Sequence, residues 1–231
     1  MIFKDAIASE ISVFSIKVRK QNFINYTYLV VDANSKCAIM VDPAWEEDKI
    51  EEVLVSMNVK LTGILLTHSH KDHTNLVDYF VAKYHCNVWM SVAEIDYYGY
   101  KCDNLIGFNQ DQTLVIGGIT VKVLLTPGHT KGSTCYLISN NLFSGDTLFI
   151  EGCGLCWGNG ANPYDMFDSL QLLNNRIGKE VLVFPGHSYG KAPGMAFEEV
   201  LNSNIYLHFK QKDMFVAFRM RNDQRTVFSF R

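Results

Sequence analysis

The chain has 231 residues, 48% of them hydrophobic and 19% charged, and its formal net charge is -3. This balance is typical of a globular protein large enough for a substantial core. A net charge of -3 lacks the strong excess of basic residues that is typical of proteins that bind nucleic acid or anionic membranes. No apolar run approaches the roughly 20 residues that span a bilayer, and the charges at Lys4, Asp5 and Glu10 interrupt any secretory signal. We therefore expect a cytoplasmic protein with neither a nucleic-acid nor a membrane partner.

Hydrophobic periodicity predicts strands and helices in alternation along the first half of the chain. The expected elements are, in chain order, strands at 11–18, 26–31 and 38–41, a helix at 45–57, a strand at 61–67 and a helix at 74–84. The run at 61–67 is apolar almost throughout, which indicates a strand buried on both faces.

The second half repeats this pattern. Its expected elements are strands at 88–90, 119–125, 135–139, 142–144 and 181–184, and a helix at 166–173. Gly117-Gly118 and Asn140-Asn141 are predicted hairpin turns, and a glycine-rich loop occupies 151–163.

No low-complexity linker or charge block divides the chain, so we predict one domain over 1–231 with a short C-terminal extension after about residue 200. Strands and helices in two similar halves indicate a layered α/β fold. The phenylalanine-rich tail at 204–231 is expected to pack on the domain surface, with a dimer contact as the alternative. A monomer and a homodimer therefore both remain open.

The six cysteines do not form a dense disulfide framework in a chain of this size. Cys153 and Cys156 are spaced as C-x-x-C, but no second such pair completes a four-thiolate zinc site. We interpret them as reduced thiols in a loop.

Five of the seven histidines and two aspartates stand just after predicted strands. These seven residues are His68, His70, Asp72, His73, His129, Asp146 and His187. Ligands of layered α/β proteins bind beyond strand ends, where several loops converge on one crevice. We therefore expect the seven side chains to meet at one place, whereas His85 and His208 have no partner pattern and are expected to be ordinary histidines.

The run from His68 to His73 has the strongest local signal. His68 and His70 are two residues apart, so in extended backbone both imidazoles point to the same side, while Asp72 and His73 can face a second position. Three imidazoles and a carboxylate within six residues would repel or desolvate one another unless a cation binds them. Nitrogen and oxygen donors without cysteine suit zinc, iron or manganese and disfavour a structural zinc site.

Four motifs in this order, THSHKDH, TPGHTKGS, FSGDTLF and PGHS, resemble the metallo-β-lactamase superfamily, and specifically its glyoxalase II-like hydrolase branch. The resemblance runs from about Ile11 to the end of the chain. It implies a four-layer αββα sandwich, in which two mixed β-sheets are flanked by helices and metal ions bind at one sheet edge.

By matching position, the resemblance implies a first metal held by His68, His70 and His129. It implies a second metal held by Asp72, His73 and His187, with Asp146 bridging both, so that Asp72 and Asp146 are the catalytic carboxylates. Two divalent ions, zinc first and iron or manganese as alternatives, would generate a hydroxide that attacks a carbonyl carbon. Classical β-lactamases have a cysteine near the position of Asp146 and lack His73 as a ligand, which disfavours antibiotic hydrolysis.

Glyoxalase II itself cleaves a glutathione thioester and binds glutathione partly through a C-terminal helical domain. The sequence after His187 is too short for that domain at full size, and Leu155 follows Gly152-Cys153-Gly154 where the family has a basic residue. Both departures weaken the case for glutathione.

The stretch 144–171, with PGHSYGK and FVAFRMR, resembles hydrolases encoded beside bacterial trans-acyltransferase polyketide synthases. That resemblance implies an acyl thioester substrate, either a small molecule or one carried on phosphopantetheine of a carrier protein. Tyr189, Lys191 and the loop from Cys153 to Pro163 are the candidates for substrate contact, although the glycines of that loop could equally serve only the turn.

Three other functions remain open. A persulfide dioxygenase uses the same pattern with one iron held by two histidines and an aspartate, and it would consume oxygen. A lactonase would differ only in substrate. A carrier-protein-binding module without catalysis is disfavoured, because nothing would preserve a complete set of seven ligands.

Overall fold

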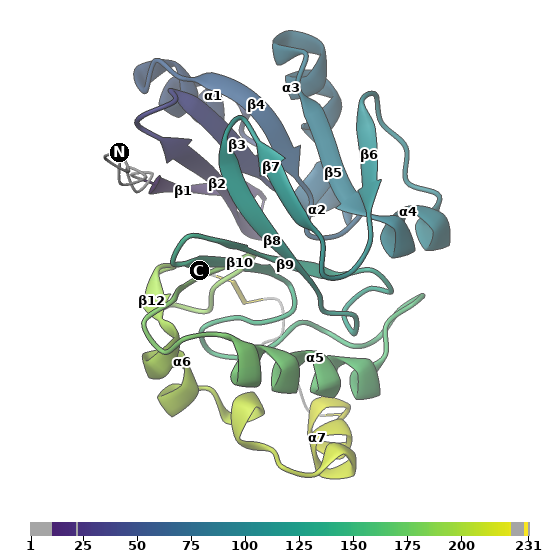
Figure 1. Ribbon diagram of the computed structural model, residues 1–231. Coiled ribbons are helices and arrows are strands. Elements are labelled where there is room, and N and C mark those ends of the chain that lie inside the picture. Colours follow the sequence, from purple (N-terminus) through teal and green to yellow (C-terminus); the bar gives the residue numbers. More distant parts are fainter. Residues whose placement is uncertain (1–10, 22, 223–228, 231) are drawn as a thin grey trace, which may run out of the picture.

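The computed structural model describes residues 11–21, 23–222 and 229–230, in which two six-stranded sheets lie face to face (Figure 1). The first sheet has its strands in chain order: β1 (Ile11–Lys20), β2 (Phe23–Asp32), β3 (Cys37–Val41), β4 (Lys60–Leu65), β5 (Asn87–Ser91) and β6 (Leu105–Phe108). β1, β2 and β3 are antiparallel neighbours, and β3 to β6 run parallel. The sheet is therefore mixed.

The second sheet runs in reverse chain order from β12 to β7. Its strands are β7 (Thr113–Ile116), β8 (Ile119–Leu125), β9 (Thr134–Ile138), β10 (Asn141–Gly145), β11 (Leu182–Pro185) and β12 (Met195–Ala196). β10 and β11 are parallel and the other pairs are antiparallel.

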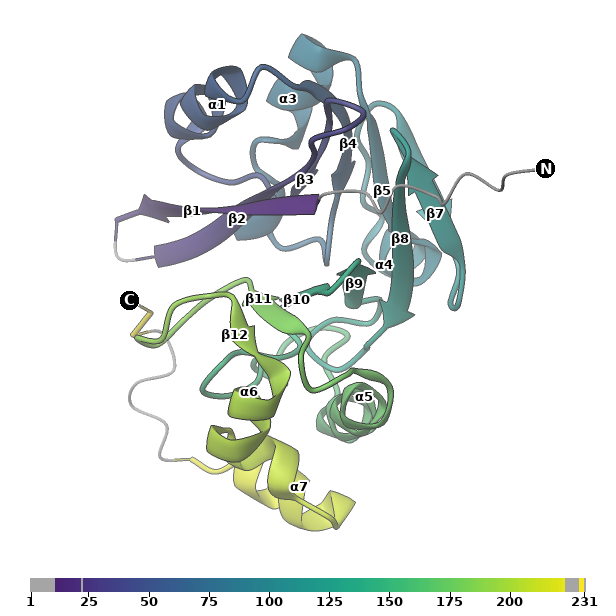
Figure 2. The ribbon, with the colours of Figure 1, turned by 60° about the vertical axis from the view of Figure 1, so that its left-hand side comes forward.

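Helices cover the outer face of each sheet, as Figures 1 and 2 show. The first half carries α1 (Glu47–Ser56), α2 (Lys71–Thr74), α3 (Val77–Tyr84) and α4 (Val92–Tyr98), and the second half carries α5 (Pro163–Arg176), α6 (Phe197–Ser203), the 3-10 helix η1 (Ile205–His208) and α7 (Lys212–Arg219). One apolar cluster joins α1 and α3 to the first sheet, one lies between the sheets, and one joins α5, α6 and α7 to the second sheet. These three apolar clusters separate four layers, two of helices and two of β-sheet. The predicted αββα sandwich is therefore confirmed.

Two local boundaries differ from the prediction. The helix expected at 74–84 begins at Val77 as α3, because the chain turns at Asn75 and Leu76 after the short helix α2. The hairpin after β9 turns at Ser139 and Asn140 instead of Asn140-Asn141, since Asn141 already pairs with Ile138. Ser139 has a φ of 51°, which supplies the left-handed conformation of this short turn.

The extension after about residue 200 folds as helices against α5. Phe215 of α7 is fully buried and packs edge-to-face on Phe167 of α5, with ring centroids 5.6 Å apart. Within the described ranges, no helix is long and apolar enough to cross a membrane. The single-domain organisation and the dimer contact stay predictions.

Candidate metal centre

Four strands deliver the seven predicted side chains to one region. His68, His70, Asp72 and His73 follow β4, and His129, Asp146 and His187 follow β8, β10 and β11. Their donor atoms form two groups, one of His68, His70 and His129 and the other of Asp72, His73 and His187, each with its atoms within 4.8 Å. His85 and His208 are exposed and lie outside both groups.

The first group places three imidazole nitrogens around one point. His70 Nδ1 lies 3.0 Å from His68 Nε2 and 3.0 Å from His129 Nε2. Tetrahedral ligands of one zinc ion, with Zn–N bonds of about 2.0–2.1 Å, have nitrogens about 3.3 Å apart. The spacing therefore suits a shared divalent cation.

Asp146 lies between the two groups. Its Oδ2 is 3.5 Å from His129 Nε2 of the first group and 3.5 Å from His187 Nε2 of the second. Its Oδ1 is 3.5 Å from His73 Nε2. In the second group, Asp72 Oδ2 lies 3.3 Å from His187 Nε2. This carboxylate is placed to serve both groups.

Two buried atoms of the centre have no hydrogen-bond partner. Within the described residues, His73 Nε2 and Asp146 Oδ1 are both buried and unpaired. Leaving such groups unsatisfied costs about 1–3 kcal/mol each, and both belong to the predicted ligands. A cation at this position would satisfy both, so the donor set fits a divalent metal.

Hydrogen bonds set which nitrogen of each imidazole is available. His129 Nδ1 donates to the Leu155 carbonyl oxygen at 2.8 Å, and His187 Nδ1 donates to the Ile24 carbonyl oxygen at 2.7 Å. A carbonyl can only accept, so each Nδ1 carries the proton and each Nε2 keeps its lone pair for a metal.

Asp42, which no sequence pattern singled out, orients two more imidazoles. Its Oδ2 accepts from His73 Nδ1 at 2.9 Å and from the Thr67 hydroxyl at 2.6 Å. Because the Thr67 proton is used by Asp42, the same hydroxyl oxygen accepts from His68 Nδ1 at 3.0 Å. One carboxylate thus holds a histidine of each group, one directly and one through Thr67.

The charges of the second group favour a cation. Burial disfavours the imidazolium of His73, but Asp72, Asp146 and Asp42 outweigh it and raise the pKa of His73 to about 10. Burial alone would raise the pKa of Asp72, but His73 and His187 hold it well below its usual value. In the first group, burial lowers the pKa of His129 to about 4. His129 is therefore neutral and keeps a lone pair for a metal, while the three carboxylates around His73 favour a positive charge at that position.

Glu94 of α4 is a second residue that the sequence analysis missed. It is fully buried, and its Oε1 accepts from the Ser69 backbone N–H at 2.8 Å and the Ser69 hydroxyl at 2.7 Å. Its Oε2 accepts from the Thr130 hydroxyl and the Gly132 N–H, both at 2.8 Å. The carboxylate therefore ties the loop that carries His70 to the loop that carries His129.

We expect Glu94→Gln to lower zinc affinity by about 10- to 100-fold, the usual effect of losing a residue that orients ligands. The amide nitrogen cannot accept, so the donors on one of the two loops lose their partner. Competition with a chromogenic chelator measures the affinity, and Asp96→Asn, at an exposed position of the same helix, is the matched control. Equal affinity in Glu94→Gln and wild type would contradict the role of Glu94.

A glycine of the PGH motif is required by close packing. A Cβ at Gly186 would lie 2.5 Å from Asp146 Oδ1 and 2.6 Å from His73 Cε1. No side chain fits there without displacing two members of the centre, which explains why glycine precedes His187.

A cavity of about 220 Å³ opens beside the centre. It is lined by Phe23, His70, Asp72, His129, Asp146, Phe149, Leu155, Trp157, His187, Tyr189 and Phe230. Of the candidates for substrate contact, Tyr189 lines this cavity, as do Leu155 and Trp157 of the loop from Cys153 to Pro163. Lys191 is exposed and Cys153 is buried, and neither is among the described lining residues. Burial raises the pKa of the Cys153 thiol, which keeps it unreactive.

The fold and the centre together are those of a metal-dependent hydrolase built on an αββα sandwich. The sequence matches the model of the metallo-β-lactamase superfamily over residues 22–187, and the chain belongs to this superfamily. It is 47% identical over 219 residues to the "Probable polyketide biosynthesis zinc-dependent hydrolase BaeB" of Bacillus velezensis, which covers 95% of this chain and 97% of that protein.

Two further comparisons agree. The chain is 33% identical over 209 residues to the hydroxyacylglutathione hydrolase of Dictyostelium discoideum, covering 81% of this chain and 74% of that protein. The crystal structure of ETHE1 from Myxococcus xanthus superposes with a TM-score of 0.81 at 26% identity, covering 91% of this chain and 92% of that one. The predicted family, fold and hydrolase class are confirmed, as is the need for a divalent metal.

Proposed function

We propose that the chain hydrolyses acyl thioesters with two zinc ions bound by the seven-residue centre. The supporting observation is the position of Asp146, with one oxygen near both histidine groups and the other unpaired beside the unpaired His73 Nε2. His68, His70 and His129 would hold one ion, Asp72, His73 and His187 the other, and Asp146 would contact both. Neutral imidazoles and carboxylates are the donors that catalytic zinc prefers.

When bound, the two ions would lower the pKa of a water so that it acts as a nucleophile near neutral pH, and would polarise the carbonyl of the thioester. The protein's own groups supply orientation. Asn25 donates to the backbone oxygen and to Oδ2 of Asp72, at 2.9 and 3.1 Å. Trp45 Nε1 donates to Asn25 Oδ1 at 2.9 Å, which sets the direction of the amide. Held in this way and ionised, Asp72 serves as a ligand and not as a proton acceptor.

A thioester is favoured over other acyl compounds by the relatives. One is named for polyketide biosynthesis, and another is named a hydroxyacylglutathione hydrolase. A thiol leaves with a pKa of about 8.5, so its departure needs no strong acid from the protein. Either phosphopantetheine, free or on a carrier protein, or glutathione would be the leaving thiol.

The test combines elemental analysis of purified protein with thiol release from two thioesters, acyl-pantetheine and S-lactoylglutathione, and with a lactone as a third substrate. About two zinc per chain, with thiol release from either thioester, is the expected result. One iron per chain with oxygen uptake on a persulfide would make the protein a dioxygenase. Turnover of the lactone alone would make it a lactonase.

A further inference from the structure

The cavity beside the metal centre has two unlike walls. One consists of five of the predicted ligands, and the other consists of Phe23, Phe149, Leu155, Trp157, Tyr189 and Phe230. These six come from β2, from the loop between β10 and α5, from the loop after β11 and from the far end of the sequence. Apart from the predicted ligands, no charged side chain of the described residues lines the cavity.

Phe230 makes a close aromatic contact with the centre. Its ring stacks on the His187 imidazole, with centroids 4.0 Å apart and planes 15° apart. It also contacts Tyr189 and Phe149, at centroid distances of 5.3 and 6.4 Å. In Figure 2 the segment that carries it lies beside the loop between β11 and β12, below the β1–β2 hairpin.

The stack leaves the metal-facing atom of His187 uncovered. His187 Nε2 points toward Asp72 and Asp146, and Nδ1 donates to Ile24, so Phe230 covers only the face of the ring. Phe230 therefore does not compete with a metal for His187. Its ring is instead a wall of the space next to the reacting atoms.

We propose that Phe230, with Phe149 and Tyr189, forms a subsite for an apolar acyl chain, so that the preferred substrates are thioesters of aliphatic acyl groups of medium length. This inference rests on the proposed thioester hydrolysis. An apolar chain gains from burial against aromatic faces. A charged acyl group would lose hydration here without meeting an opposite charge on this wall.

Binding is measured without turnover. Isothermal titration calorimetry of the zinc-loaded protein compares S-octyl and S-ethyl thioethers of N-acetylcysteamine, which lack the thioester carbonyl and are not cleaved. Wild type is expected to bind the octyl compound at least about tenfold more tightly, because each buried methylene contributes roughly fourfold. Phe230→Ala should reduce this ratio about tenfold, and Phe230→Leu should retain most of it. Zinc content is measured in each variant, to show that the centre is intact.

Tyr164→Ala is the matched control, since Tyr164 is an exposed aromatic residue of α5 outside the cavity. An octyl-to-ethyl ratio equal in wild type and Phe230→Ala would overturn the acyl subsite, as would an equal loss in Tyr164→Ala.

Hydrolysis of acetyl and octanoyl N-acetylcysteamine is followed on the same samples. A rise in KM for the octanoyl compound alone in Phe230→Ala supports the subsite, whereas an equal loss on both compounds contradicts it. If wild type cleaves neither compound while the binding ratio still depends on Phe230, the proposed hydrolysis fails and the apolar subsite stands.

Discussion

Replacing His70 with alanine is expected to reduce hydrolysis about 1,000-fold or more while leaving the fold intact. His70 Nδ1 is one of three nitrogens that converge in the first group, 3.0 Å from each of the other two. A metal ion contributes several kcal/mol of charge stabilisation in the transition state, and about 4 kcal/mol corresponds to 1,000-fold in rate. The side chain is exposed, so its loss leaves no cavity in the core.

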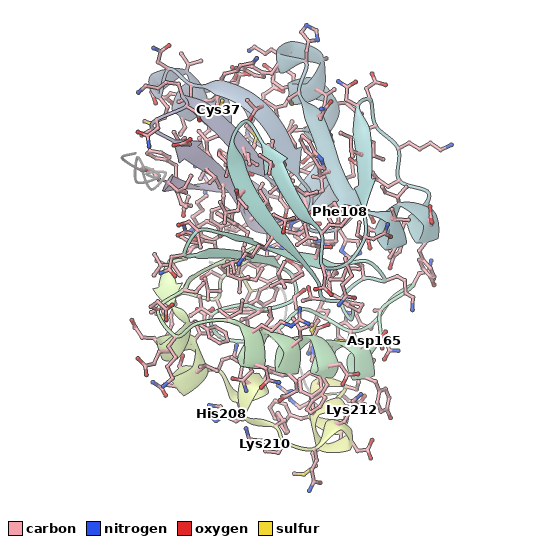
Figure 3. All side chains as sticks on the ribbon, viewed as in Figure 1. Cys37, Phe108, Asp165, His208, Lys210 and Lys212 are labelled. Carbon is pink, nitrogen blue, oxygen red and sulfur yellow. The ribbon has the colours of Figure 1, made fainter. Side chains whose placement is uncertain are left out.

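Steady-state kinetics, zinc content and thermal unfolding together check this expectation. His208→Ala is the matched control, because Figure 3 shows His208 on the surface of the C-terminal helices, where it is exposed. Wild-type turnover in His70→Ala would remove the first group from the mechanism. Loss of cooperative unfolding would instead assign His70 a structural role.

Asp146→Asn is expected to lower the zinc content at both positions, from about two ions per chain to below one. The substitution removes a negative charge shared by His129, His73 and His187, which lie 3.5 Å from its oxygens. The amide offers one neutral oxygen in place of two charged ones, so the interaction of this side chain with a cation at either position is weakened. The shape of the side chain is kept, so the fold of the metal-free protein should remain intact.

Elemental analysis after dialysis, with zinc titration of the metal-free protein, measures this effect. Asp103→Asn, at an exposed position, is the control for a change of one charge. Loss of a single ion, with the second retained at wild-type affinity, would show that Asp146 belongs to one group only. Unchanged content would exclude it from the centre.

Short-range patterns in the sequence predicted much of the fold. Apolar patterning identified the meander of β1, β2 and β3 to within a few residues. β1 alternates between exposed and buried positions near its end, whereas β2 and β3 are apolar runs buried on both faces. The break between α2 and α3 was missed. The helical spacing of apolar residues includes Leu76, although the helical backbone is interrupted at Asn75 and Leu76. The C-terminal helix α7 was missed as well, because it is short and shares its buried face with α5.

The sequence by itself determined the family and, through that resemblance, the four-layer architecture. It also indicated which seven side chains gather, because ligand spacing and strand ends are local properties of the chain. Only the tertiary structure revealed how these side chains are held. Asp42, Glu94 and Asn25 act through hydrogen bonds to residues 25 to 47 positions away, and isolated polar residues carry no pattern that names such partners. The stack of Phe230 on His187 likewise depends on where the segment that carries Phe230 lies in the folded protein. Contacts between distant segments depend on packing of the whole molecule, which periodicity cannot encode.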